Sequence, residues 1–128
     1  MSDLSGSERR NLERLLGMGS GYVLDFSDRT FGEFFDEYRV EIDAERYKAQ
    51  GTSKAKRMRA FWDIDENHIV GRVISGLINY AIEQQCFSDS NPLLIENCRK
   101  IAQRLLIGQP VAELDALTAI ANDRDFEV

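Results

Sequence analysis

The 128-residue sequence has few of the residues on which several protein classes depend. With two prolines, two cysteines and one histidine, it lacks a proline-rich tract, a disulfide framework and the ligand spacing of a zinc site. No apolar run approaches the ~18 residues of a membrane span, so we expect no membrane association. The N-terminal stretch MSDLSGSERR carries an acid and no apolar core, unlike a secretory signal. We therefore expect a cytoplasmic protein in which Cys86 and Cys98 are free, partly buried thiols.

The sequence does have the composition of one ordinary folded domain. Apolar residues make up 43% of the chain and charged residues 30%, close to the averages of globular proteins. A chain of this length buries a sizeable core without staples such as disulfides or metals. We predict a single helical domain over residues 1–121, followed by a polar tail over residues 122–128.

The spacing of apolar residues predicts an all-α fold, an irregular bundle of six or seven helices. The clearest helix covers residues 66–85, where apolar pairs recur every four residues and indicate the centre of the core. A second helix carries an aromatic face made of Phe31, Phe34, Phe35 and Tyr38. One short extended segment is expected near residues 22–26. The helices expected in full cover residues 7–16, 28–38, 43–50, 54–62, 66–85, 92–107 and 110–121.

Single residues indicate where these helices begin and where they meet. Ser7, Ser27 or Asp28, Ser53 and Asp65 are each predicted to start a helix, because short polar side chains bind the free amides of a first turn. Gly71 and Gly76 lie inside the expected central helix, where each costs about 1 kcal/mol relative to alanine. We therefore expect other helices to approach the backbone closely at both glycines.

The stretch GMGSGYVLDF, residues 17–26, places three glycines in five positions beside a short apolar run. A phosphate-binding loop follows a buried strand and leads into a helix, whose N-terminal amides face the anion. Here a helix precedes the glycines, and Tyr22 occupies the third glycine position of the G-x-G-x-x-G pattern. We interpret Gly17 as the residue that ends the preceding helix. An enzyme acting on a small molecule or nucleotide is a third hypothesis, which rests on this stretch alone.

Residues 63–68 imitate the opening of a calcium-binding loop, Asp-x-Asp-x-Asn. The next position requires glycine and holds His68, and the twelfth requires a bidentate glutamate and holds Ile74. His68 is the only histidine, and no nucleophile motif accompanies it. We therefore expect no metal, no cofactor and no catalytic residue in this chain, and predict that it is not an enzyme.

One segment is locally basic. Residues 48–59, KAQGTSKAKRMR, contain no acid and carry +5; because the chain is −6, the remainder is −11. On a helix, Ala55, Met58 and Trp62 are expected on one side and the basic residues around the other. The basic face is either neutralised by acids of neighbouring helices or contacts an anion, a nucleic acid or an acidic protein. The candidate binding residues are Lys54, Lys56, Arg57, Arg59 and Trp62.

Two longer stretches carry a family resemblance, namely SGYVLDFSDRTFGEFF and GTSKAKRMRAFWDIDENHIVGRVISGLI. They resemble the N-terminal helical region of bacterial abortive-infection family proteins, those with the abortive-infection C-terminal domain. A glycine-serine-glycine turn leads into an aromatic helix, and the segment G-x-S-K-x-x-R-x-R-x-F-W precedes a long apolar helix. The similarity covers most of residues 12–126. Ser53, Lys54, Arg57, Arg59 and Trp62 match the second motif.

The resemblance implies a role in limiting phage infection. It implies a non-catalytic regulatory or interaction module that senses or assembles for a C-terminal effector, with residues 122–128 beginning the linker. The implied partners are that effector domain, a second copy of the chain or a phage component. The alternative hypothesis is a nucleic-acid-binding module that uses the basic segment 48–59.

Overall fold

The computed structural model describes residues 1–87 and 91–107, and within them the fold is all-α. This part of the chain contains five α-helices and two short 3-10 turns, and no strand. The helix expected over residues 110–121 and the polar tail over residues 122–128 lie outside the described residues. The α-helices are α1 Gly6–Leu15, α2 Asp28–Asp36, α3 Lys54–Ile64, α4 Asn67–Glu83 and α5 Pro92–Ile107, and the 3-10 turns are η1 Met18–Ser20 and η2 Glu45–Lys48.

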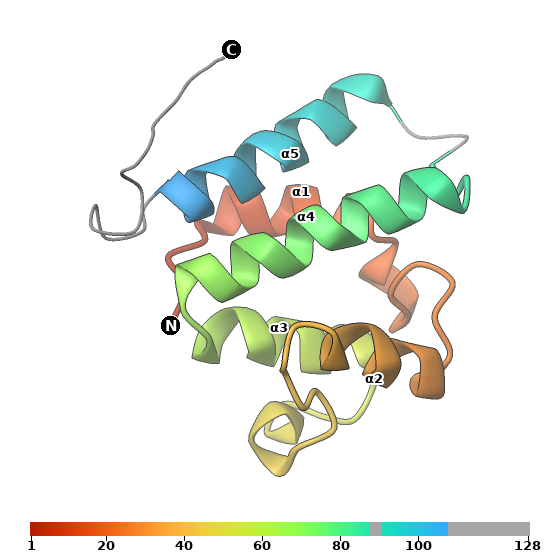
Figure 1. Ribbon diagram of the computed structural model, residues 1–128, viewed down its shortest axis with the longest axis vertical. Coiled ribbons are helices and arrows are strands. Elements are labelled where there is room, and N and C mark those ends of the chain that lie inside the picture. Colours follow the sequence, from red (N-terminus) through yellow and green to blue (C-terminus); the bar gives the residue numbers. More distant parts are fainter. Residues whose placement is uncertain (88–90, 108–128) are drawn as a thin grey trace.

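Helix α4 is the centre of the molecule, as its apolar pattern predicts. In Figure 1 it runs between α5 on one side and α2 and α3 on the other, and α1 packs against α5. Burying each large aliphatic side chain contributes roughly 1.5–3 kcal/mol, so this helix supplies much of the hydrophobic free energy. Its buried residues are Val70, Gly71, Val73, Ile74, Leu77, Ile78 and Ala81.

The two glycines of α4 are sites of close approach, which confirms the sequence-based prediction. A Cβ on Gly71 would lie 3.0 Å from the Cβ of Leu105 and 3.1 Å from the backbone oxygen of Ala102, both in α5. A Cβ on Gly76 would coincide with the end of the Tyr38 side chain, which follows α2. Helix α4 thus lies close to α5 at one glycine and admits a tyrosine ring at the other.

The predicted extended segment near residues 22–26 is wrong, because this stretch is a compact turn. Leu24 adopts a positive φ of 48°, and the amide of Phe26 donates a hydrogen bond to the carbonyl of Val23 at 3.2 Å. The turn buries both Val23 and Phe26, whereas an extended chain without a neighbouring strand would leave its backbone unpaired. The expected stop at Gly17 is confirmed by its left-handed conformation, φ 67°.

The predicted helix starts are confirmed in part. Ser27 and Ser53 accept hydrogen bonds from the first turns of α2 and α3, as expected. Helix α1 begins after Ser5 rather than Ser7, because Ser5 and Glu8 cap each other reciprocally. Helix α4 begins after Glu66, because Asp65 ends α3 and accepts a hydrogen bond from the Tyr47 hydroxyl at 2.6 Å. The expected helix over 43–50 is reduced to η2.

The start of the chain packs against α3 and α5. The amide of Ser2 donates to the carbonyl of Trp62 at 3.3 Å. Arg104 of α5 pairs with Asp3 at 3.0 Å and with Glu8 at 2.7 Å. The N-terminus and the last turn of α5 therefore lie on the same side of the molecule (Figure 1).

Candidate functional site: an aromatic groove between α2 and α4

Arg57, the first of the sequence-predicted binding residues, is buried beneath two carboxylates. Its guanidinium donates to Asp28 at 2.7 Å, to the backbone oxygen of Thr52 at 3.1 Å and, through Nη1, to Asp43. The same group lies 5.3 Å from the ring centroid of Phe31. Only 4% of the Arg57 side chain is exposed, so this arginine joins α2, α3 and the loop before η2 rather than facing a ligand.

Two further basic residues of the segment are also paired within the fold. The ammonium of Lys54 lies 3.8 Å from Asp28 and 4.9 Å from the ring centroid of Tyr22, and the side chain is buried. Arg59 donates to both carboxylate oxygens of Glu13, at 3.1 and 3.3 Å. The acids of neighbouring elements therefore neutralise Lys54, Arg57 and Arg59.

The remaining two candidates lie apart from each other. Trp62 is fully buried, and its indole N–H finds no hydrogen-bond partner among the described residues. Lys56 is exposed, with its aliphatic stem against Gly51. The structure therefore does not bring the five candidates together on one surface.

The expectation that basic residues cover only the outer side of α3 is wrong for Lys54 and Arg57. Lys54 precedes Met58 by four residues and Arg57 precedes Phe61 by four, so helical periodicity places both on the apolar face. The periodicity was therefore present in the sequence as a signal. Their burial depends on Asp28 and Asp43, whose approach to α3 is a tertiary contact.

The acids beside His68 serve the fold. Asp63 pairs with Arg9 at 2.8 Å and accepts a hydrogen bond from Gln50 at 2.9 Å, while Asp65 is held by Tyr47. Across residues 1–87 and 91–107, no group of three or more His, Cys, Asp or Glu side chains gathers in a way that would hold a metal ion.

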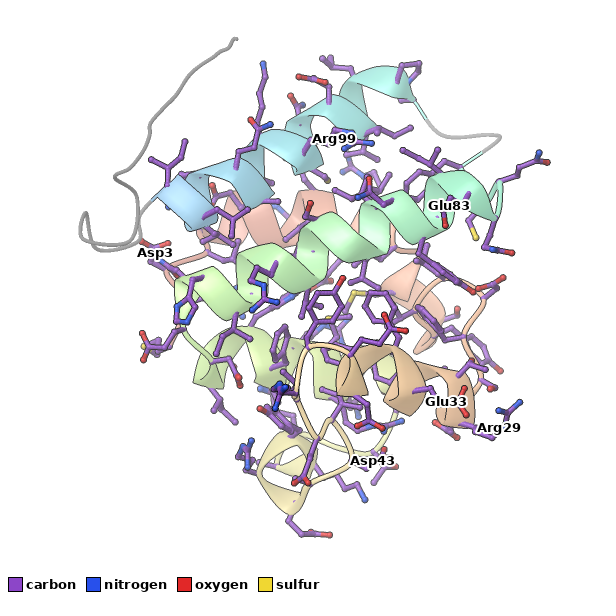
Figure 2. The ribbon with its side chains drawn as sticks, viewed as in Figure 1. Asp3, Arg29, Glu33, Asp43, Glu83 and Arg99 are labelled. Atoms are coloured by element: carbon purple, nitrogen blue, oxygen red, sulfur yellow. The ribbon has the colours of Figure 1, made fainter. Side chains whose placement is uncertain are left out.

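A solvent-open hollow lies between α2 and α4. It is a groove of about 510 Å³, within the range of ligand-binding clefts. Glu33 of α2 and Glu83 of α4 line it, and Figure 2 shows both on the same side of the molecule. The groove is lined by Phe26, Thr30, Glu33, Phe34, Glu37, Tyr38, Gly76, Asn79, Tyr80 and Glu83.

Aromatic rings line the groove and connect its two helices. Phe26 stacks on Tyr80 with ring centroids 4.6 Å apart and an interplanar angle of 15°. Phe34 meets Tyr80 at 6.1 Å and Tyr38 at 5.3 Å. Phe34, Tyr38 and Tyr80 are only partly buried, so these rings are available to a ligand as well as to the core.

The charged groups that line the groove are all acidic. Its lining includes the carboxylates of Glu33, Glu37 and Glu83. The Tyr80 hydroxyl donates to Asp25 at 2.7 Å; burial and this carboxylate together raise the pKa of Tyr80 to about 12. The phenol therefore stays protonated at neutral pH.

Two arginines lie at the edge of the groove. Arg29 pairs with Glu33 at 2.9 Å, one helical turn away. Arg72 lies 5.8 Å from the ring centroid of Tyr38. Among the described residues that line the groove itself, none is a lysine or an arginine.

Sequence reasoning missed the groove because it assigned the aromatic face of α2 to packing alone. The available signal was a second stripe on α4: Gly76, Asn79, Tyr80 and Glu83 follow helical spacing and differ from the aliphatic face. That α2 packs beside this stripe follows from the Phe26–Tyr80 and Phe34–Tyr80 contacts, which the sequence does not reveal.

The helices within the described ranges lack either the length or the apolar composition that crossing a membrane requires. Comparisons with family models, with curated proteins and with solved structures found no match to this chain.

Proposed function

We propose that this chain is a non-catalytic interaction module that binds a protein partner through the groove between α2 and α4. In line with its resemblance to abortive-infection proteins, it regulates or assembles a C-terminal effector in defence against phage. The observation that carries this proposal is the groove itself, an open cleft lined by partly exposed aromatic rings. Aromatic side chains are enriched at protein interfaces, where they contribute much of the binding energy.

The rigidity of the groove supports the same proposal. Its rings belong to α2, to α4 or to the turns on either side of α2, and Phe26 and Tyr80 stack on each other. A preformed surface loses little conformational entropy on binding, so more of the contact energy contributes to affinity.

The nucleic-acid alternative receives less support from the geometry. Lys54, Arg57 and Arg59 are each paired with a carboxylate, so they offer phosphates little free positive charge. No second function is therefore proposed.

The proposal is tested by mixing the chain with the effector domain that the resemblance implies, and by measuring complex formation with size-exclusion chromatography and light scattering. The same experiment on the chain alone reports self-association. Asn79 lines the groove and is exposed, so Asn79→Trp should fill the groove and abolish either complex. Gln103→Trp, an equally bulky change on the exposed side of α5, is the matched control. A strict monomer that ignores the effector domain, or binding unaffected by Asn79→Trp, would refute the proposal.

A further inference from the structure

We infer that the groove between α2 and α4 receives an arginine side chain, presented by a basic segment of the partner protein. This inference rests on the proposed function and specifies the chemistry of its partner. Three features carry it: the charge of the groove, the exposed ring surfaces, and the way this fold already places arginines on its own rings.

The charge of the groove is complementary to a cation. Glu33, Glu37 and Glu83 line it, and one of them, Glu33, is paired with Arg29. A further carboxylate, that of Asp25, accepts a hydrogen bond from the hydroxyl of Tyr80, one of the lining residues. Arg72 approaches Tyr38 from the edge but forms no ion pair with these three glutamates. Because the whole chain is also −6, its long-range field attracts a basic segment and repels an acidic one.

The rings favour a cation that has a flat face. A guanidinium stacks on an aromatic ring and forms paired hydrogen bonds with a carboxylate, whereas an ammonium is a compact, strongly hydrated charge. Partly exposed rings and carboxylates occur side by side in this groove, as Phe34 and Tyr80 with Glu37 and Glu83. The site therefore offers both interactions that distinguish arginine from lysine.

Arginine already makes this contact elsewhere in the molecule. The guanidinium of Arg46 lies 4.6 Å from the ring centroid of Tyr47, and that of Arg57 lies 5.3 Å from Phe31 while pairing with two carboxylates. At the groove edge Arg72 lies over Tyr38. The inferred ligand would repeat, in an open groove, the arrangement that Arg57 makes in the interior.

The experiment is a titration of the ¹⁵N-labelled chain with short glycine-serine peptides that carry one central residue. That residue is arginine, lysine, citrulline or norleucine, and citrulline keeps the shape of arginine without its charge. The arginine peptide should produce saturable chemical-shift changes at the Gly76 amide and the Asn79 side-chain amide. Its dissociation constant should be several-fold lower than that of the lysine peptide. Citrulline and norleucine peptides should produce none. Equal binding of the arginine and citrulline peptides, or shifts that lie outside the groove, would overturn the inference.

A charge-removal variant tests the carboxylates without disturbing the core. Glu37 and Glu83 are both exposed, so Glu37→Gln with Glu83→Gln should leave the fold intact and weaken arginine-peptide binding about tenfold. Glu96→Gln, an exposed acid on α5, should leave binding unchanged. Undiminished binding by the double variant would also overturn the inference.

The proposed function and this inference fail in different ways. If Asn79→Trp abolishes the protein complex while the double glutamine variant binds the partner normally, the interaction module stands and the arginine inference falls. If Asn79→Trp leaves the protein complex intact, the proposed function falls. Loss of the complex in both variants, together with the selective arginine-peptide shifts, supports both.

Discussion

The hydroxyl end of Tyr38 occupies the space that a side chain on Gly76 would fill. Gly76 lies in the middle of α4, where alanine would be intrinsically better by about 1 kcal/mol. Tyr38 follows α2 and lines the groove. A missing methyl group on one helix thus determines where an aromatic ring of another element rests.

Gly76→Ala should therefore displace Tyr38 and lower the free energy of unfolding by about 1 kcal/mol, because overpacking outweighs the gain in helix propensity. In a Tyr38→Ala background the same change should stabilise the protein by up to about 1 kcal/mol. Urea unfolding of the four proteins in this double-mutant cycle measures the coupling. If the two changes in unfolding free energy are additive, the Tyr38 side chain does not determine the cost of an alanine at position 76.

Removing the two acids that pair with Arg57 should destabilise the protein more than removing Arg57 itself. Asp28 and Asp43 are exposed by 78% and 67%, whereas Arg57 is buried. Asp28→Ala with Asp43→Ala leaves a buried cation without a carboxylate partner, and we expect a loss of about 3 kcal/mol in unfolding free energy. Arg57→Met keeps apolar volume against Phe31 and leaves only hydrated acids, so it should cost less. Chemical denaturation at neutral pH ranks the two variants; the reverse order would contradict this account.

Tyr80 should make the protein sensitive to alkaline pH. Burial, followed by the hydrogen bond to Asp25, raises its pKa to about 12 from an ordinary value of 10.0. Because the folded pKa exceeds the unfolded one, the associated stability is fully present below pH 10 and is lost as pH rises toward 12. Asp25→Asn should lower the pKa of Tyr80 while leaving it above 10, since burial persists. Ultraviolet titration of wild type against Tyr80→Phe isolates this phenol, and ionisation near pH 10 would contradict the prediction.

Arg104 should shape the response to acid. Its hydrogen bond lowers the pKa of Asp3 below 3.8; for Glu8, burial opposes the shift, but hydrogen bonds from Arg104 and the Ser5 amide lower the pKa below 4.5. Lowered folded pKa values stabilise the protein above the unfolded values, and this stability is lost as pH falls through the folded values. The stability difference between wild type and Arg104→Gln should therefore be largest near neutral pH and shrink below pH 4.5.

Urea unfolding across a pH series measures that difference. Arg99→Gln, a neighbouring change on α5 that removes the same charge, serves as the control and should show a difference that varies little with pH. If the difference in unfolding free energy between wild type and Arg104→Gln is also constant across pH, the pairing of Arg104 with Asp3 and Glu8 does not contribute to stability.

Local patterns in the sequence were sufficient to predict most of the helices. The apolar pairs of α4, the aromatic face of α2, the Ser27 and Ser53 caps and the Gly17 stop each depend on residues within a few positions of one another. The prediction of an extended segment around Val23 and Phe26 was wrong because it, too, relied on local pattern alone. A short apolar run does not say whether its residues point to opposite faces of a strand or to one side of a turn.

The candidate site required information that adjacent residues do not contain. Burial of Lys54 and Arg57 depends on Asp28 and Asp43, which are distant in sequence. The groove likewise requires α2 to pack beside one particular stripe of α4, which is fixed by the rings of Phe26 and Tyr80. The sequence therefore marks the basic segment as unusual, but it does not show that Lys54, Arg57 and Arg59 pair with acids inside the fold.

Closure of the fold by Arg104 onto Asp3 joins positions that are 101 residues apart. Removing either α1 or α5 would expose the apolar side of the other helix. We therefore expect a protein shortened in this way to aggregate. A purification tag attached ahead of Ser2 must likewise preserve the hydrogen bond from the Ser2 amide to the carbonyl of Trp62.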